Sequence, residues 1–301
     1  MLKLIGLALV CSTFSFADIF TFSSIDFPGE ETWAEGINGR GQIVGVARGT
    51  GDDHGFLYSG GTFTSIVSSP SSWGTQVYKI NDSGQIVGRN LGTLQGFVYS
   101  AGTFTSLAPL VAFGLNNAGT FVGGEVNDPH GFIQAGGSLS IIDFPGASNT
   151  TLHGINDYGQ IVGQYLNFGV PPIHGFLDDG GLFTPLDYPG AINTWAMGIN
   201  DLGQIVGSYD SPSTGNFYTN NSRHGFLYSG GAYTSIDFPW AVFTEANGLS
   251  DSGQIVGNYT DSQGVRHGFL ATAAVPEPTG LILFLLPLGL TIARLKLKHQ
   301  T

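Results

Sequence analysis

Cysteine is almost absent from this sequence, and positive charges are scarce. The single cysteine, Cys11, lies close to the N-terminus, so the rest of the chain has no thiol, no disulfide and no cysteine ligand for a metal ion. Between residues 18 and 274 there are 6 Lys and Arg against 21 Asp and Glu. Such an excess of negative charge argues against nucleic acid or an anionic membrane surface as the partner.

Catalytic and nucleotide-binding motifs are also missing. The sequence contains no Gly-x-Ser-x-Gly, no His-Glu-x-x-His, no phosphate loop and no dinucleotide fingerprint. Its 47 glycines are interpreted as turn residues. The motifs therefore predict no catalytic residue, no metal ligand and no cofactor. A hydrophobic content of 42% with 22 Phe nevertheless provides a large core, which argues against a disordered chain.

One phrase recurs six times, built on Gly-Ile-Asn-Asp-x-Gly-Gln-Ile-Val-Gly with a period of about 42 residues. No helical pattern occurs inside the period, which is the size of a propeller blade. The copies are anchored at Asn38, Asn81, Asn116, Asn156, Asn200 and Ser250. Five copies are followed by His-Gly-Phe, beginning at His54, His130, His174, His224 and His267, and the second has Gln95 instead.

The fifth repeat predicts a four-stranded antiparallel unit, with strands over 194–200, 204–209, 224–228 and 233–238. The last repeat stops before its fourth strand, and residues 22–29 near the N-terminus have the sequence of that missing strand. The sequence therefore predicts an all-β fold over residues 18–274, a six-bladed β-propeller of four-stranded blades closed by its N-terminal strand. An open β-solenoid is the alternative.

Both ends of the chain differ from the repeats. Residues 1–17 have the pattern of a signal peptide, with Lys3, an apolar run and a small-residue cleavage site that ends at Ala17. Residues 275–301 contain the motif Pro276, Glu277 and Pro278, an apolar run over 279–293 and a basic cluster that begins at Arg294. Fifteen helical residues reach about 22 Å, less than the roughly 30 Å of a bilayer core. A plain membrane anchor remains the alternative interpretation of this segment.

The order of these C-terminal features resembles the PEP-CTERM sorting signal. The resemblance implies export by a Gram-negative-type bacterium, transient membrane association through 279–293, processing by an exosortase, and delivery to the cell surface or an exopolysaccharide matrix. The repeats themselves resemble the HAF family of probable extracellular repeats, whose His-Ala-Phe motif is here His-Gly-Phe. This second resemblance implies export and supplies no activity.

Three repeated motifs have a structural interpretation beside a functional one. Asn-Asp-x-Gly offers too few oxygens for calcium, and its residues are typical of tight turns. Phe-Pro-Gly places Pro and Gly where a type II turn prefers them, and the preceding Asp residues, such as Asp143, are interpreted as structural. The five His of His-Gly-Phe begin the third strand, about 10 Å outside the innermost one. We therefore expect them to bind a neighbouring strand or loop, and not one metal ion.

Loop variation indicates where a ligand could bind. The turns between strands one and two and between strands three and four are uniform, and their end of the ring is called the constant face. The other connections vary in length, and their end is called the variable face. The four tryptophans are predicted to lie there, in the connections between blades: Trp33, Trp73, Trp195 and Trp240.

Exposed indoles close to Asp and Asn suit stacking on sugar rings. The alternative is that these indoles wedge between blades. The sequence thus predicts an exported, non-catalytic repeat protein of the cell surface or exopolysaccharide matrix that binds or organises an extracellular ligand, with polysaccharide as the candidate. A polysaccharide-acting enzyme that uses the same face is the alternative function.

Overall fold

A computed structural model describes residues 20–68, 73–125, 128–167, 172–212 and 223–273. The signal peptide and the sorting segment predicted at the two ends lie outside these residues. Within the described part every regular element is a β-strand. That part contains no helix long and apolar enough to cross a membrane.

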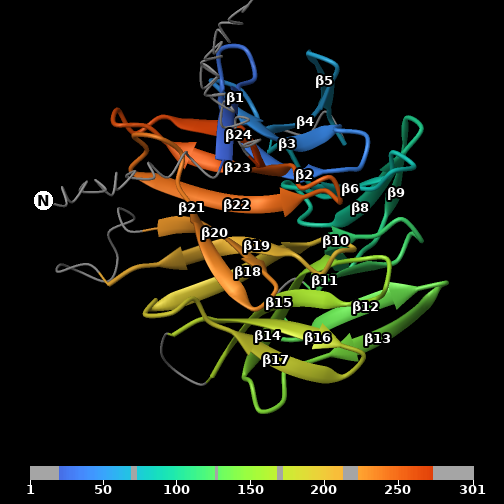
Figure 1. The fold of residues 1–301 in the computed structure, drawn as a ribbon. Helices are drawn as coiled ribbons and strands as arrows, with labels where there is room; N and C mark the ends of the chain where they lie inside the picture. The colour runs from blue at the N-terminus through green and yellow to red at the C-terminus, as the bar shows by residue number, and fades with distance from the viewer. Residues whose placement is uncertain (1–19, 69–72, 126–127, 168–171, 213–222, 274–301) are drawn as a thin grey trace, which may run out of the picture. The chain divides into compact units, whose positions relative to one another are not determined.

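Twenty-four strands form six four-stranded antiparallel sheets, arranged as the blades of a ring (Figure 1). Blade 1 has β2 (Glu31–Ile37), β3 (Ile43–Arg48), β4 (His54–Ser59) and β5 (Thr62–Ile66); blade 2 has β6 (Thr75–Ile80), β7 (Ile86–Asn90), β8 (Gly96–Ser100) and β9 (Thr103–Ser106). Blade 3 has β10 (Leu110–Leu115), β11 (Phe121–Glu125), β12 (Gly131–Ala135) and β13 (Ser138–Ile142); blade 4 has β14 (Asn149–Ile155), β15 (Ile161–Leu166), β16 (His174–Asp179) and β17 (Leu182–Leu186). Blade 5 has β18 (Asn193–Ile199), β19 (Ile205–Asp210), β20 (Arg223–Ser229) and β21 (Ala232–Ile236); blade 6 has β22 (Phe243–Leu249), β23 (Ile255–Thr260), β24 (Arg266–Ala273) and β1 (Phe20–Ile25).

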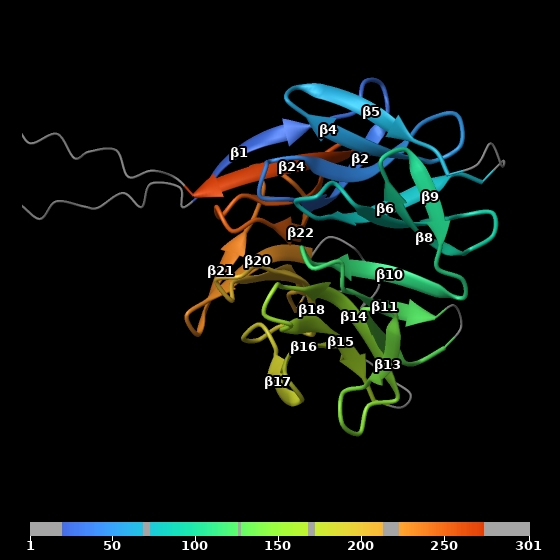
Figure 2. The same ribbon diagram turned by 90° about the vertical axis from the view of Figure 1, so that its right-hand side faces the viewer.

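The N-terminal strand closes the ring, as the sequence predicts. β1 lies antiparallel to β24 at the outer edge of blade 6, visible in both ribbon views (Figures 1 and 2). Their register pairs Phe20 with Ala273 and Ile25 with Gly268. The Phe22 ring packs edge-on against Phe269 of the same blade, with the ring centroids 5.7 Å apart. The six-bladed β-propeller is therefore confirmed.

Two repeated residues fill the middle of each blade. The Phe of His-Gly-Phe is fully buried in five blades, and the Gly of Ile-Val-Gly on the neighbouring strand leaves room for its ring. In blade 5, a Cβ added to Gly207 would lie 2.8 Å from the ring of Phe226. The same Cβ would lie 1.8 Å from the Trp195 backbone oxygen on the other side, so glycine is required there by the neighbouring strand as well as by the Phe226 ring.

The asparagine of each turn joins one blade to the next. The Asn38 Oδ1 atom accepts a hydrogen bond from the Gln42 backbone N–H within its own turn, and its Nδ2 donates to the carbonyl oxygen of Asn81 in the next blade. The same link recurs four more times, from Asn81 to Asn116, Asn116 to Asn156, Asn156 to Asn200 and Asn200 to Ser250. Asn-Asp-x-Gly is therefore a turn and an inter-blade contact.

This ring of asparagine contacts is open where blade 6 meets blade 1. Ser250 replaces the asparagine there, and its hydroxyl is hydrogen-bonded to Ser252. Two other buried amides join these blades: Asn247 Nδ2 donates to the Ala34 carbonyl oxygen, and Asn258 Oδ1 accepts from the Ala34 backbone N–H. The joint between the first and last blades therefore has its own contacts as well as the shared strand.

The repeated histidines bind the outer strand of their own blade, as expected. Each His Nδ1 lies within 3.0 Å of the Asp that follows the fourth strand, in four blades. The pairs are His130–Asp143, His174–Asp187, His224–Asp237 and His267–Asp26. The last pair crosses the ring closure, because β1 supplies the aspartate. These carboxylates therefore tie strands together.

Phe-Pro-Gly forms the expected type II turn. In the connection from blade 3 to blade 4 the Ala147 backbone N–H donates to the Phe144 carbonyl oxygen, and Gly146 has a φ of 82°. Glycine is favoured there because a positive φ costs it nothing. Trp240 occupies the same position after blade 5, with a φ of 66°.

Candidate functional site at the mouth of the central channel

Every innermost strand has a β-bulge at the same place. The register with the second strand shifts between Ala34 and Gly36 in β2 and at the corresponding pair in the other five blades. A bulge leaves its extra residue unpaired and turns the side chain away from the ladder. The six bulged residues, one per blade, are Glu35, Tyr78, Phe113, His153, Met197 and Asn247.

These six bulged residues, called the bulge ring, are all different. The residue before each of them is apolar, and the residue after it is glycine in every blade except blade 2, which has Lys79. The position two residues before the bulge also varies, with Trp33, Gln76, Val111, Thr151, Trp195 and Glu245. Variation of this kind on a constant scaffold is typical of a binding site. The bulge ring is therefore the first candidate for function.

A cavity of about 220 Å³ lies over part of the bulge ring. It is lined by the bulged residues of blades 1, 4, 5 and 6, two tryptophans, two arginines and the ends of neighbouring strands. The volume is below the roughly 300–1,000 Å³ of pockets that take drug-sized ligands. The lining residues are Trp33, Glu35, His153, Gln164, Trp195, Met197, Ser208, Arg223, Glu245, Asn247, Asn258 and Arg266.

The structure separates the four predicted tryptophans into two pairs. Trp33 and Trp195 lie within the innermost strands β2 and β18, not in the connections between blades, and both line the cavity. The expectation that all four lie in connections is therefore wrong for Trp33 and Trp195, because β2 and β18 begin two residues before these tryptophans. Trp73 and Trp240 are 69% and 96% exposed and lie outside the cavity lining.

Arginines pack on both cavity tryptophans. The guanidinium carbon of Arg48 lies 4.5 Å from the Trp33 ring centroid, and that of Arg223 lies 4.0 Å from the centroid of Trp195. Contacts of this length are favourable cation–π interactions. These contacts hold Trp33 and Trp195 in place at the cavity wall.

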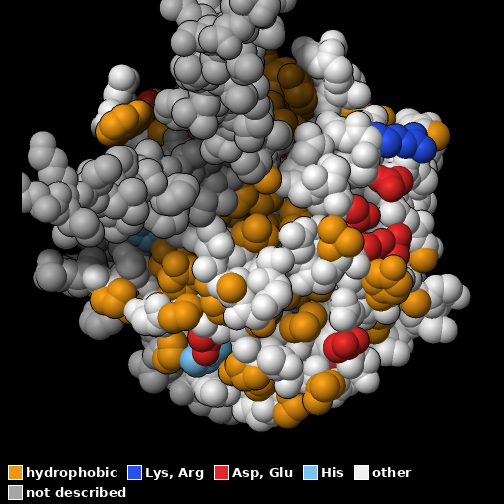
Figure 3. All heavy atoms as spheres, in the orientation of Figure 1, with side chains coloured by type: hydrophobic (Ala, Val, Ile, Leu, Met, Phe, Trp, Pro, Cys, Tyr) orange, Lys and Arg blue, Asp and Glu red, His pale blue; other side chains and the backbone are white. Residues whose placement is uncertain are grey.

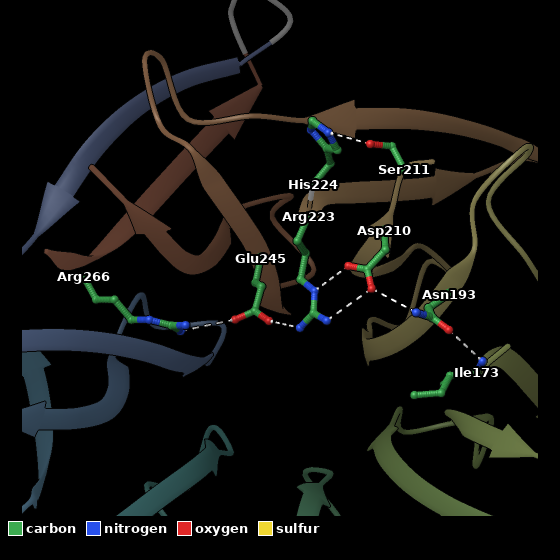
Figure 4. Close-up of polar contacts among 8 residues, drawn as sticks. All are labelled: Ile173, Asn193, Asp210, Ser211, Arg223, His224, Glu245 and Arg266. Carbon is green, nitrogen blue, oxygen red and sulfur yellow. Dashed lines mark hydrogen bonds and ion pairs between the residues drawn. The ribbon is translucent and has the colours of Figure 1, made fainter. Parts of the chain in front are cut away.

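Glu245 lies between two arginines of neighbouring blades (Figure 4). Its Oε1 accepts a hydrogen bond of 2.9 Å from Arg223, which also contacts Asp210 at 2.9 Å. Its Oε2 is 4.0 Å from Arg266. Asp210 in turn accepts from Asn193 (Figure 4). The network fixes one wall of the cavity with partly buried, paired charges.

Lys79 occupies the channel one residue beyond the bulge ring. Five blades have glycine at this position, and only blade 2 has lysine. Its ammonium donates to the carbonyl oxygen of Glu35 at 2.8 Å and to that of Asn247. Burial lowers the pKa of Lys79 to about 8, and the negative charge of Glu35 opposes that shift.

Glu35 is held in an unusual protonation state. Burial raises its pKa from 4.5 to about 7, and the carboxylate of Glu245 adds to the effect. The pKa of Glu35 is lowered in turn by the charge of Lys79, by a hydrogen bond with Asn258 and by the charge of Arg266. The carboxyl group is therefore protonated more readily than an exposed glutamate, and its protonated form can donate as well as accept a hydrogen bond.

His153 is the other titratable residue of the bulge ring. Burial lowers its pKa to about 4, Lys79 lowers it further, and a hydrogen bond with Gln164 opposes both. The imidazole is thus neutral at neutral pH. Its Nε2 is buried without a hydrogen-bond partner in the described structure. An orphaned polar atom beside a cavity is costly, and a ligand hydroxyl would satisfy it.

The opposite end of the channel contains a second polar ring. Its mouth is lined by the Asn-Asp turns of the blades, including Asp82, Asp157, Asp201 and Asp251. Each Asp accepts a backbone hydrogen bond from the preceding blade, as Asp201 does from Asp157 at 2.8 Å. The described residues contain no group of three or more His, Cys, Asp or Glu placed to hold a metal ion. These carboxylates serve as inter-blade contacts.

His153, which lies outside the repeated His-Gly-Phe motifs, is the one member of the bulge ring that the sequence places near the central opening; the other five members, Lys79 and the arginines were not predicted. A signal was available for the first two: alignment of the six repeats gives one fully variable column on the innermost strand, and Lys replaces Gly beside it in one copy. The arginines gave no such signal, because Arg223 and Arg266 precede their His-Gly-Phe motifs in variable connections. Nothing in the local sequence indicates that these side chains reach the channel.

The comparisons with known proteins concern the fold alone. No family model and no curated protein matches the sequence. A streptogramin B lyase structure is similar, with a TM-score of 0.50 and 11% identity over 85% of this chain and 98% of that chain. A virginiamycin B lyase from Staphylococcus aureus with quinupristin gives 0.48 and 10% over 85% and 100%. The propeller domain of the Trilobed protease from Pyrococcus furiosus gives 0.46 and 9% over 80% and 95%.

Proposed function

We propose that residues 18–274 form an exported, non-catalytic binding protein that holds one sugar residue of an extracellular polysaccharide in the channel-mouth cavity. The observation that carries this proposal is the cavity itself, because it joins two fixed indoles to a set of polar groups that differ from blade to blade. Indole surface packs against the apolar face of a pyranose, and amides and hydroxyls bind its edges.

The size and chemistry of the cavity fit such a ligand. A volume of about 220 Å³ suits one small ring, so a longer chain would leave the cavity across the variable face. His153 Nε2, buried without a partner, and the Glu35 carboxyl can each bind a ring hydroxyl. A buried polar group that binds a ligand hydroxyl discriminates strongly against a ligand without that hydroxyl, because the polar group is then left without a hydrogen bond.

Glycan binding is tested with the domain 18–274 on a glycan array, followed by calorimetry on each hit. We expect Trp195→Phe and Trp33→Phe to weaken binding about tenfold or more, as for a contact that dominates an interface. Trp73→Phe and Trp240→Phe are the matched controls and should leave the affinity unchanged. Binding that depends only on the control residues, or no binding to any glycan, would contradict the proposal.

A polysaccharide-acting enzyme is the second candidate, and one observation favours it. Glu35, with a pKa of about 7, shares the cavity with the Glu245 carboxylate and the neutral His153. Such groups suit general acid and base roles. Incubation of the bound oligosaccharide with the domain, followed by product analysis by mass spectrometry, decides between the two. Product formation that Glu35→Gln abolishes would establish the enzyme.

Export to the cell surface or the matrix of a Gram-negative-type bacterium belongs to the same proposal. It is supported by the signal-like residues 1–17 and by the ordered Pro-Glu-Pro motif, apolar run and basic cluster of residues 275–301. An exosortase is the proposed processing partner. Mass spectrometry of the exported protein should show both segments removed. Recovery of Lys298 in a membrane-embedded product would instead establish a plain anchor.

A further inference from the structure

The few cations of the domain gather at one place. Residues 20–273 contain six Lys and Arg, in a chain with a net charge of -12. Five of them surround the cavity mouth or the bulge ring beneath it, and only Arg40 lies on the constant face, in the turn that follows Asn38. The five are Arg48 and Arg266 beside Trp33, Arg223 beside Trp195, Lys79 on the Glu35 carbonyl, and Arg89 hydrogen-bonded to Gln76 of β6.

The domain as a whole has the opposite charge, with 21 Asp and Glu against 6 Lys and Arg between residues 18 and 274. On the face shown in Figure 3, acidic side chains are plainly more frequent than Lys and Arg. Most of such a surface would repel an anionic ligand. Positive side chains that gather in a concave site with a low dielectric constant concentrate their electrostatic field there and attract an anion. The cavity is therefore the place on this domain where an anion is tolerated.

The charge of the lining depends on Glu35. Two arginines, Arg223 and Arg266, face two carboxyl groups, Glu35 and Glu245, with the ammonium of Lys79 one residue deeper. Asp210 also pairs with Arg223, so three basic side chains stand against three carboxyl groups. Burial raises the pKa of one of these carboxyl groups, Glu35, which makes its negative charge less favourable. Neutral His153 adds no charge.

The two cavity arginines differ in how fully they are paired. Arg223 has two carboxylates within hydrogen-bond distance, Asp210 and Glu245, both at 2.9 Å. Among the described residues, the guanidinium of Arg266 has one carboxylate within 4.0 Å, that of Glu245, which is too far for a hydrogen bond. A second carboxylate, that of Glu31, accepts a hydrogen bond of 3.4 Å from the Arg266 backbone N–H. Its side chain is 29% exposed, and its guanidinium lies 5.6 Å from the Trp33 ring centroid. Arg266 thus retains donors beside an indole.

We propose that the ligand of the cavity is an acidic saccharide whose carboxylate binds Arg266 while its ring packs against Trp33 and Trp195. This inference rests on the proposed saccharide-binding function and names the class of sugar. A guanidinium presents a planar fork of N–H donors that matches the two oxygens of a carboxylate. The indole on one side and the fork on the other fix the orientation of a single uronate residue.

The test compares matched pairs of oligosaccharides by calorimetry with the domain 18–274. The acidic members are oligogalacturonate, oligomannuronate and a hyaluronan tetrasaccharide, and each partner is the same molecule with its carboxylates reduced to hydroxymethyl groups. We expect the acidic form to bind at least about tenfold more tightly than its reduced partner, the ratio that one charge-assisted contact supplies. Moderate salt should narrow the ratio.

Arg266→Gln should weaken binding of the acidic form at least about tenfold and so remove the preference for it, and Arg266→Lys should keep part of the preference. Arg40→Gln, on the constant face, is the control. Thermal melting of each variant verifies that it folds. Equal binding of both forms, still dependent on Trp33 and Trp195, would overturn this inference and leave the proposed function standing. Absence of any tryptophan-dependent binding would overturn both.

Discussion

Deletion of residues 18–29 should open the ring. The deletion removes β1 and with it two buried side chains, Phe20 and Ile25, which are 7% and 6% exposed. Each buried side chain of this size contributes about 1.5–3 kcal/mol, and each lost strand hydrogen bond adds about 1 kcal/mol. The deletion also uncovers the apolar side of Phe269. With about six hydrogen bonds for the six paired positions of β1 and β24, the total is on the order of 10 kcal/mol, which is comparable to the whole stability of many domains.

Circular dichroism melting and size-exclusion chromatography measure the effect. We expect the truncated domain to unfold near room temperature or to associate through the bare edge of β24. A circular permutant provides the control: residues 18–29 follow Ala273 through a linker of about two to five residues, which suits a hairpin because Ala273 lies opposite Phe20. The permutant should regain the stability of the intact domain.

Point substitutions give a graded version of the same test. Ile25→Ala should cost about 2–4 kcal/mol, whereas Thr21→Ala, at an exposed position of the same strand, should change stability by less than about 0.5 kcal/mol. A truncated domain that stays monomeric and melts within a degree or two of the intact one would refute closure by this strand.

Three further predictions concern the rings of polar contacts. Ser250→Asn should close the asparagine ring by donating to the Asn38 carbonyl oxygen, which stabilises the domain by about 1 kcal/mol and raises Tm by about 2–4 °C; an unchanged or lower Tm would contradict this. The Glu35→Gln variant lacks a group whose pKa is raised to about 7 in the folded protein. Because such a group destabilises the parent progressively as the pH rises from 4.5 to 7, the stability of the variant relative to the parent should increase over that range, by about 3 kcal/mol at most. His153, whose pKa is lowered to about 4 in the folded protein, makes both proteins more stable as the pH rises from 4 to 6.5, so its contribution cancels when the two are compared. A stability difference that does not depend on pH would refute the raised pKa of Glu35. Asp201→Ala should lower Tm equally with and without millimolar calcium, because the carboxylate accepts a backbone hydrogen bond; a calcium-dependent loss would instead indicate a cation site.

The fold could be predicted from sequence because its determinants repeat. Asn200, Gly207 and Phe226 have counterparts in most blades, and each makes the same turn or packing contact there. The shared strand was predictable for the same reason, since residues 22–29 repeat the outer strand of other blades. Residues that recur in the repeats are therefore those that form the turns and the core of each blade.

The site could not be predicted in the same way, because its residues are those that do not repeat. Glu35 and His153 occupy one structural position, but a sequence phrase does not show that a bulge turns both into the channel. Trp33 and Trp240 have the same side chain, yet one lines the cavity and the other is 96% exposed. That difference depends on strand boundaries, which local patterns place only to within a few residues.

Fluorine NMR of the domain labelled with 5-fluorotryptophan tests the central claim most directly. The four tryptophans give separate resonances, which single Trp→Phe substitutions assign. On titration with the oligosaccharide that binds most tightly, we expect the resonances of Trp33 and Trp195 to shift and saturate together, while those of Trp73 and Trp240 stay in place. Shifts confined to Trp73 or Trp240, or no saturable shift with any acidic or neutral oligosaccharide, would contradict the assignment of the channel mouth as a saccharide-binding site.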